Sequence, residues 1–104
     1  MYHYIVYAIL TNPVVRYVRV ADGQIWDGST LLLARAPTYA NTAIALTRNT
    51  SINGIPVTIP TTLPDGEYDM LFYDSASPAE TDTVSLGKRI AWTKSGLLGL
   101  PLDL

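Results

Sequence analysis

The chain contains 104 residues, of which 48% are hydrophobic and only 15% charged, with a net charge of −2 at pH 7. This length fits one domain, and seven basic against nine acidic residues form no basic stripe, so we expect no nucleic-acid partner. The absence of cysteine excludes disulfides, thiolate catalysis and cysteine-ligated metal sites. So little charge indicates a surface partly covered by a partner, the alternative being an ordinary monomer surface rich in threonine, serine and asparagine.

The first stretch, Tyr2–Leu10, predicts a strand. Aromatic and β-branched residues occupy both faces, with Tyr2 and Tyr4 on one and Tyr7 on the other. A strand that is apolar on both faces is either central in a sheet or part of an interface. It is too short to span a bilayer and no Lys or Arg precedes it, so we expect neither a signal peptide nor a membrane partner.

Short apolar runs then alternate with turn sequences. Val14–Val20 predicts a second strand, which the tight-turn sequence Asp22–Gly23 joins to Gln24–Trp26. The segments predicted next are a turn at 27–28, an apolar run at 31–34, a loop at 36–41, a strand at 43–48 with Ile44 and Leu46 inward, and a polar turn at 49–54. Prolines 56 and 60 confine the following strand, 55–59, to a sheet edge or a bulge.

The last two long strands follow strong turn signals. Pro64–Asp65–Gly66 opens the stretch up to Asp74, which is the clearest strand prediction in the chain. After a loop at 75–81, residues 83–92 predict a strand with a bulge at Gly87. The side chains expected to face inward are Tyr68, Met70 and Phe72 in the first strand and Val84, Leu86, Ile90 and Trp92 in the second.

The C-terminal arm, about residues 97–104, alternates leucine with small or polar residues. Leu98, Leu100, Leu102 and Leu104 fall on one side and must be buried somewhere. Either the arm closes its own domain or it docks on a neighbouring subunit, and we expect at least some docking. The residues predicted to form the interface are therefore Tyr2, Tyr4, Tyr7, Leu98, Leu100, Leu102 and Leu104.

No helical period of useful length is present. Seven or eight short strands at roughly ten-residue spacing predict an all-β fold, an antiparallel β-sandwich (Ig-like or jelly-roll-like) or a small barrel, as a single domain over residues 1–104.

The sequence nominates no catalytic, metal or cofactor site. His3 stands in an apolar strand with no partner at motif spacing, so we expect it to be structural and a hydrolase to be a poor third candidate. Asp65, Asp69 and Asp74 lack the spacing of a calcium loop. The tyrosines suit a core or an interface, with Tyr17, Tyr39 and Tyr73 the most accessible; a sugar site at Trp26 and Tyr39 stays open.

Five pieces of the sequence together resemble the small β-sandwich domains of tailed-bacteriophage virion structural proteins. They occur in that family's order and cover about residues 20–93. The pieces are Gly23–Ser29, Ala43–Thr47, Pro64–Asp69, Ser77–Asp82 and Ile90–Trp92.

The resemblance implies a non-enzymatic virion protein made in the host bacterial cytoplasm, either a capsid cement (decoration) protein or a tail or tail-fibre module. It carries no catalytic residues and no cofactor. The family domain often belongs to a longer chain, and a free-standing copy fits a cement protein better. We therefore expect a dimer or trimer that binds another virion protein such as the major capsid protein, with binding to host surface sugar or to another tail protein as the alternative.

Overall fold

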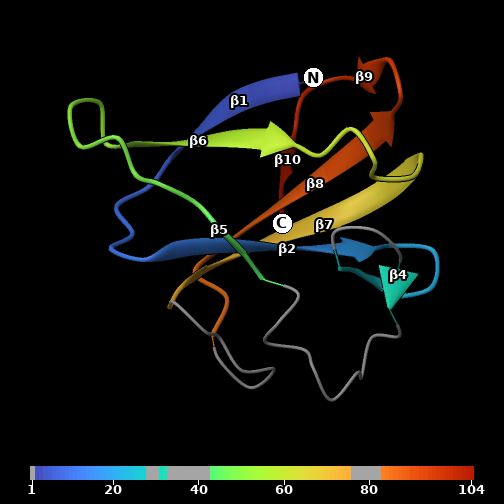
Figure 1. Ribbon diagram of the computed structural model, residues 1–104, viewed down its shortest axis with the longest axis horizontal. Coiled ribbons are helices and arrows are strands. Elements are labelled where there is room, and N and C mark those ends of the chain that lie inside the picture. Colours follow the sequence, from blue (N-terminus) through green and yellow to red (C-terminus); the bar gives the residue numbers. More distant parts are fainter. Residues whose placement is uncertain (1, 28–30, 33–42, 76–82) are drawn as a thin grey trace.

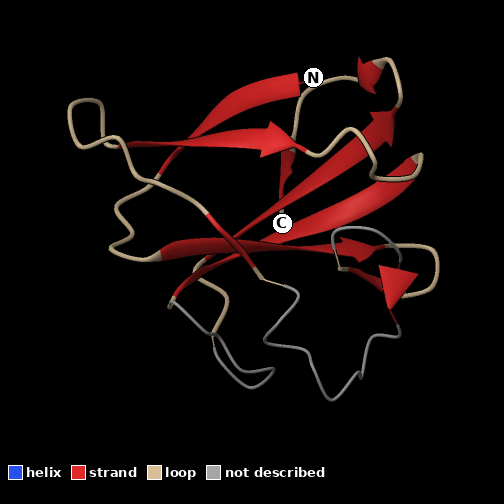
Figure 2. Cartoon of the chain, viewed as in Figure 1, coloured by secondary structure: helices blue, strands red, loops and turns tan. Residues whose placement is uncertain are grey.

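The structure, a computed structural model, describes residues 2–27, 31–32, 43–75 and 83–104. These residues contain strands and loops and no helix (Figure 2). The predicted loop at 36–41, and the loop at 75–81 beyond Ser75, lie outside the described residues. The strands are β1 (Tyr2–Tyr7), β2 (Pro13–Arg19), β3 (Ile25–Trp26), β4 (Leu31–Leu32), β5 (Ile44–Ala45), β6 (Gly54–Ile59), β7 (Gly66–Asp74), β8 (Leu86–Thr93), β9 (Gly96–Leu97) and β10 (Leu102–Asp103).

The strands form two layers, which confirms the predicted antiparallel β-sandwich (Figure 1). The smaller layer is the β1–β6 pair. The larger sheet has the order β10-β8-β7-β2-β3-β4, with β5 also on β2 and β9 also on β8. Within the described residues every strand pairing is antiparallel. As the prolines predicted, β6 is an edge strand, because β1 is its only partner in the described part of the chain.

The core fills the space between the two layers. Period-2 alternation directs one face of each strand inward, so Tyr68, Met70 and Phe72 of β7 are fully buried, as predicted. They meet Ile55, Val57 and Ile59 of β6, and the cluster is completed by Val6, Leu10, Val15, Tyr17, Trp26, Leu63, Ile90 and Trp92. The indole Nε1 of Trp92 donates to the Leu63 carbonyl at 2.8 Å, which ties the β6–β7 connection to β8.

The hairpin predicted at Asp22–Gly23 is present. Gly23 adopts φ 70°, a conformation that glycine reaches without steric cost, and its N–H donates to the Arg19 carbonyl. The Arg19 guanidinium binds both carboxylate oxygens of Asp22, at 3.0 and 2.5 Å. The turn therefore fixes the β2–β3 register, in which Val18 stands opposite Ile25.

Two predictions for the strand at 83–92 are wrong. The β7–β8 register runs without interruption from Gly66–Trp92 to Phe72–Leu86, so Gly87 is not a bulge. The glycine instead makes room on the outer face of β8, because a Cβ there would lie 2.8 Å from Leu104 Cδ1. Val84 is exposed rather than inward, since β8 begins only at Leu86.

The accessibility expected of Tyr17 and Tyr73 is also wrong, since both side chains are buried. Tyr17 faces the core and contacts Trp26 edge-to-face, with ring centroids 6.1 Å apart. Tyr73 lies on the other face of the sheet under the fully buried Arg16, whose Cζ is 4.8 Å from the ring centroid. β2 is thus buried on both faces, which period-2 alternation alone could not reveal.

Candidate interface

The outer face of β1 presents apolar side chains that the fold does not cover. Val6 points into the core, whereas Ile5 is 40% exposed and Tyr7 and Ile9 are each 72% exposed. The Tyr4 side chain packs against the core, and its hydroxyl donates to Met70 Sδ at 3.4 Å. Of the predicted tyrosines, Tyr7 is more exposed than Tyr4, and the side chain of Tyr2 lies outside the described part of the structure.

The C-terminal arm runs back along β8 and pairs with it twice. β9 pairs Leu97 with Trp92, and β10 pairs Leu102 with Arg89. Between these pairings the Leu98 N–H donates to the Ala91 carbonyl. Three arm residues therefore lie between Leu98 and Leu102, against one residue between their partners on β8, so two residues bulge out. Gly99, at φ 83°, supplies the left-handed turn that this bulge requires.

The arm's backbone is docked on its own domain while its leucine side chains are left outside. Leu97 packs against the core, but Leu98, Leu100, Leu102 and Leu104 are 60–82% exposed. Pairing of the arm with its own sheet therefore provides partners for its main chain but does not bury these four leucine side chains. The uncovered leucine surface remains a candidate for docking on a neighbour.

One groove brings the two predicted interface segments together. It has a volume of about 340 Å³ and lies between β1 and the arm. This groove is here called the arm groove. It is lined by Tyr4, Ile5, Val6, Tyr7, Leu86, Lys88, Leu100 and Pro101. Leu100 thus meets Tyr4 and Tyr7 at one site, although almost the whole length of the chain separates it from the two tyrosines. Lys88 is the basic member, and its ammonium group forms an ion pair with Asp103 of β10.

Leu102 and Leu104 lie apart from the arm groove, on the outer face of the large sheet. Leu104 borders a second hollow of about 630 Å³, together with Leu71, Val84 and Gly87. Its backbone N–H donates to the Gly87 carbonyl at 3.2 Å. The predicted interface leucines of the arm therefore lie on two neighbouring surfaces, with Leu100 at the arm groove and Leu102 and Leu104 on the outer face of the large sheet.

Replacing Gly87 by valine will release the end of the arm. The new side chain would press on Leu104 Cδ1 and Cβ, so Leu104 must shift and we expect its hydrogen bond to residue 87 to weaken. We expect amide exchange at Leu104 to accelerate about tenfold, measured by hydrogen exchange with NMR detection. Ala91→Val, on the same face of β8 but beside Leu98, is the control; equal acceleration in both variants would contradict the assigned role of Gly87.

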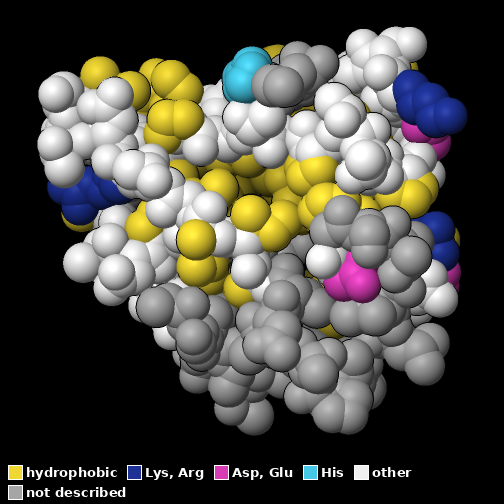
Figure 3. All heavy atoms as spheres, viewed as in Figure 1, with side chains coloured by type: hydrophobic (Ala, Val, Ile, Leu, Met, Phe, Trp, Pro, Cys, Tyr) yellow, Lys and Arg dark blue, Asp and Glu magenta, His cyan; other side chains and the backbone are white. Residues whose placement is uncertain are grey.

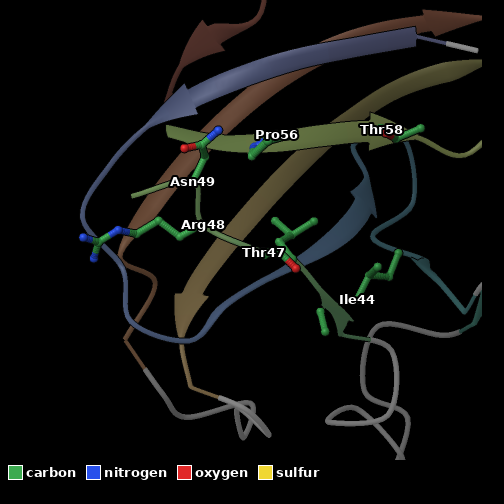
Figure 4. A pocket seen from close by; sticks show the side chains of 8 residues that line it. Ile44, Thr47, Arg48, Asn49, Pro56 and Thr58 are labelled. Atoms are coloured by element: carbon green, nitrogen blue, oxygen red, sulfur yellow. The ribbon is translucent and has the colours of Figure 1, made fainter. Parts of the chain in front are cut away.

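The sandwich has a second opened side, between β5 and β6. Figure 3 shows hydrophobic side chains gathered in a hollowed band across this face, with most coloured charged side chains toward its margins. A groove of about 580 Å³ lies here, lined by Ile44, Ala45, Leu46, Thr47, Arg48, Asn49, Pro56 and Thr58. Pro56 and Thr58 project from β6 across from Ile44 and Thr47, while Arg48 points away from the groove (Figure 4). No sequence pattern indicates this groove, because β5 and β6 come together only in the tertiary fold.

Several of the described titratable groups have structural partners. His3 Nδ1 lies 2.8 Å from Thr58 Oγ1 across the β1–β6 pair. The Arg89 guanidinium binds both oxygens of Asp69, and the Arg19 guanidinium holds the pKa of Asp22 below its usual range through a hydrogen bond. No group of three or more potential metal-ligating side chains occurs among the described residues. These contacts hold turns and cross-strand pairs together.

Tyr17 makes the stability of the fold sensitive to alkaline pH. Burial raises the pKa of its phenol far above the ordinary value of about 10, and the nearby Tyr4 adds to the effect. The unfolded chain loses this proton at a lower pH than the folded chain does. The free energy of unfolding should therefore fall as the pH rises above about 10. Urea titrations across this range should show a smaller fall for Tyr17→Phe, while Tyr7→Phe should match the unchanged protein.

A sugar site built on Trp26 and Tyr39 receives no support from the geometry. The Trp26 ring is 3% exposed and packs against Tyr17, so it offers no face on which a sugar could stack. Tyr39 lies outside the described residues.

In the described part of the chain no helix is long and apolar enough to cross a membrane. Comparison of the chain with protein-family models, with curated proteins and with solved structures finds no match.

Proposed function

We propose that the chain is a non-enzymatic structural protein of a bacteriophage virion, and that it acts as a capsid cement protein that assembles as a dimer or trimer. The observation that carries the proposal is the apolar surface around the arm groove. Tyr7 at the end of β1, Ile9 just after this strand and Leu100 on the arm are each more than two-thirds exposed in the described structure. A monomer gains nothing from keeping such residues in water, whereas a subunit interface buries them.

The amino-acid composition supports the same proposal. Only 15% of the residues are charged, well below the usual value of about 25%, so a large part of the surface carries no charge that opposes burial. Cores of protein interfaces are depleted in charge and enriched in tyrosine. The ion pair of Lys88 with Asp103 beside the arm groove neutralises its basic member and lowers the cost of covering it.

The mechanism is stabilisation of a shell by repeated burial. Each buried Å² of apolar surface contributes roughly 25 cal/mol, so even a modest contact becomes substantial when many copies bind neighbouring shell subunits. The partners are other copies of the chain and a second virion protein such as the major capsid protein. A tail or tail-fibre module that docks on another tail protein would use the same surface and is the second candidate.

Mass spectrometry of purified particles tests the proposal. The virus that encodes the chain should contain it in many copies, in a fixed ratio to the major capsid protein for a cement role. A few copies that separate with isolated tails would favour the tail module instead. Complete absence from the particles, together with a monodisperse monomer in sedimentation analysis, would contradict both candidates.

A further inference from the structure

Arg48 lies where the chain crosses from β5 to β6, and no carboxylate among the described residues forms an ion pair with its guanidinium. Its Nε is shielded from solvent and has no hydrogen-bond partner among the described residues. By contrast, Arg19, Lys88 and Arg89 pair with carboxylates. A shielded donor without an acceptor lowers stability, and more so when it carries charge. The described part of the chain therefore leaves the Arg48 cation without a carboxylate partner, which an anion from outside could supply at the terminal nitrogens.

The Arg48 side chain reaches away from the β5–β6 groove and toward the loop that joins β1 to β2 (Figure 4). There it borders another hollow, of about 420 Å³. This hollow is here called the Arg48 hollow. It is lined by Thr11, Asn12, Pro13, Leu46, Thr47, Arg48 and Thr50. Three hydroxyls and one amide can donate hydrogen bonds at this rim, and none of the lining residues is acidic.

We propose that the Arg48 hollow binds a carboxylate group. The two terminal nitrogens of a guanidinium form a planar fork, which fits the two oxygens of a carboxylate. The threonine hydroxyls and the Asn12 amide are placed to donate to the same oxygens, and Pro13 and Leu46 accommodate an aliphatic stem. The hollow shares no lining residue with the arm groove, so the site does not depend on the function proposed above.

Asp74 modulates this site. Its Oδ1 accepts the backbone N–H of Asn12 at 2.7 Å, and this bond holds the β1–β2 loop that forms one wall of the hollow. Its negative charge opposes a second carboxylate nearby, so affinity for a small carboxylate should be modest. Asp74→Asn keeps an acceptor for the Asn12 N–H and removes the charge, and should therefore strengthen binding.

Titration of the ¹⁵N-labelled protein with sodium acetate tests the proposal. The Arg48 Nε–H resonance should shift and approach a plateau, whereas the same concentrations of sodium chloride should leave it almost unchanged. Arg48→Lys keeps the charge without the fork, and binding detected at Thr47 and Thr50 amides should weaken about tenfold. Lys94→Gln, at an exposed cation of the β8–β9 turn, is the control and should bind acetate as the unchanged protein does.

A linear shift without a plateau, an equal response to chloride, or unchanged binding in Arg48→Lys would overturn the proposal. Backbone spectra of the variants establish that the sandwich is folded before each titration. A capped peptide with one aspartate, compared with its asparagine counterpart, then distinguishes the two sources of a carboxylate. Binding about tenfold tighter than acetate assigns the site to an acidic side chain of a protein, and equal binding assigns it to a free small carboxylate.

Discussion

Replacing Leu98, Leu100, Leu102 and Leu104 together by serine will abolish self-association while the sandwich stays folded. All four side chains are at least 60% exposed in the single chain, so their loss removes little buried surface from the fold. If an interface buries them, each contributes roughly 1 kcal/mol, about half of the value for full burial of a leucine. Four such losses weaken association roughly a thousandfold. Sedimentation equilibrium measures the change, and circular dichroism checks the strands.

A matched control is Val20→Ser, which removes an apolar side chain that is 37% exposed at the β2–β3 hairpin, away from the arm. It should leave the dissociation constant within about twofold of the original value, because single surface changes outside an interface have small effects. An oligomer that survives all four leucine replacements would show that the arm contributes nothing to assembly. The contact would then have to be sought on the outer face of β1.

Replacing Phe72 by alanine will lower the free energy of unfolding by about 3–5 kcal/mol. The ring is fully buried between the layers, and its removal leaves a cavity that the β-sheet backbone cannot close. This loss is at least a fifth of the stability typical of a domain, about 5–15 kcal/mol. Urea denaturation followed by tryptophan fluorescence is a suitable measurement, because Trp26 and Trp92 are both buried in the same core.

Val84→Ala is the matched control for this experiment. Alternation in the sequence places Val84 on the inward side of the same predicted strand as Trp92, but the structure leaves it 39% exposed before β8 begins. Its replacement should change stability by less than about 0.5 kcal/mol. Comparable losses in the two variants would contradict the placement of Phe72 in the core and of Val84 outside it.

The strands were predictable because local signals and tertiary packing agree along most of the chain. The turn at Pro64–Gly66 and the alternation of Tyr68, Met70 and Phe72 specify β7 without any knowledge of its neighbours. The hairpin at Asp22–Gly23 is equally local. These elements lie at the centre of the large sheet, so the all-β sandwich followed from them.

What the sequence could not supply are the contacts between distant segments. A glycine inside a strand indicates either a bulge or the close approach of another group, and only the position of Leu104, seventeen residues later, decides for Gly87. Alternation predicts which residues of β2 share a face, but it does not show that both faces are covered. The burial of Tyr17 and Tyr73 was therefore not predicted. The leucines of the arm were predicted as interface residues from their spacing, and that role stays a prediction, whereas the Arg48 hollow depends on the β1–β2 loop meeting the β5–β6 crossing.

The two-residue bulge in the arm has a consequence for the size of any assembly. A straight outermost strand offers a regular ladder of main-chain donors and acceptors to the next molecule, and so permits endless stacking into fibrils. Here Gly99 bends the margin of the sheet, and Pro101, which has no N–H, deprives it of one donor. At this edge, contacts between copies are thereby left to side chains, which favours closed clusters of defined size over open-ended polymers.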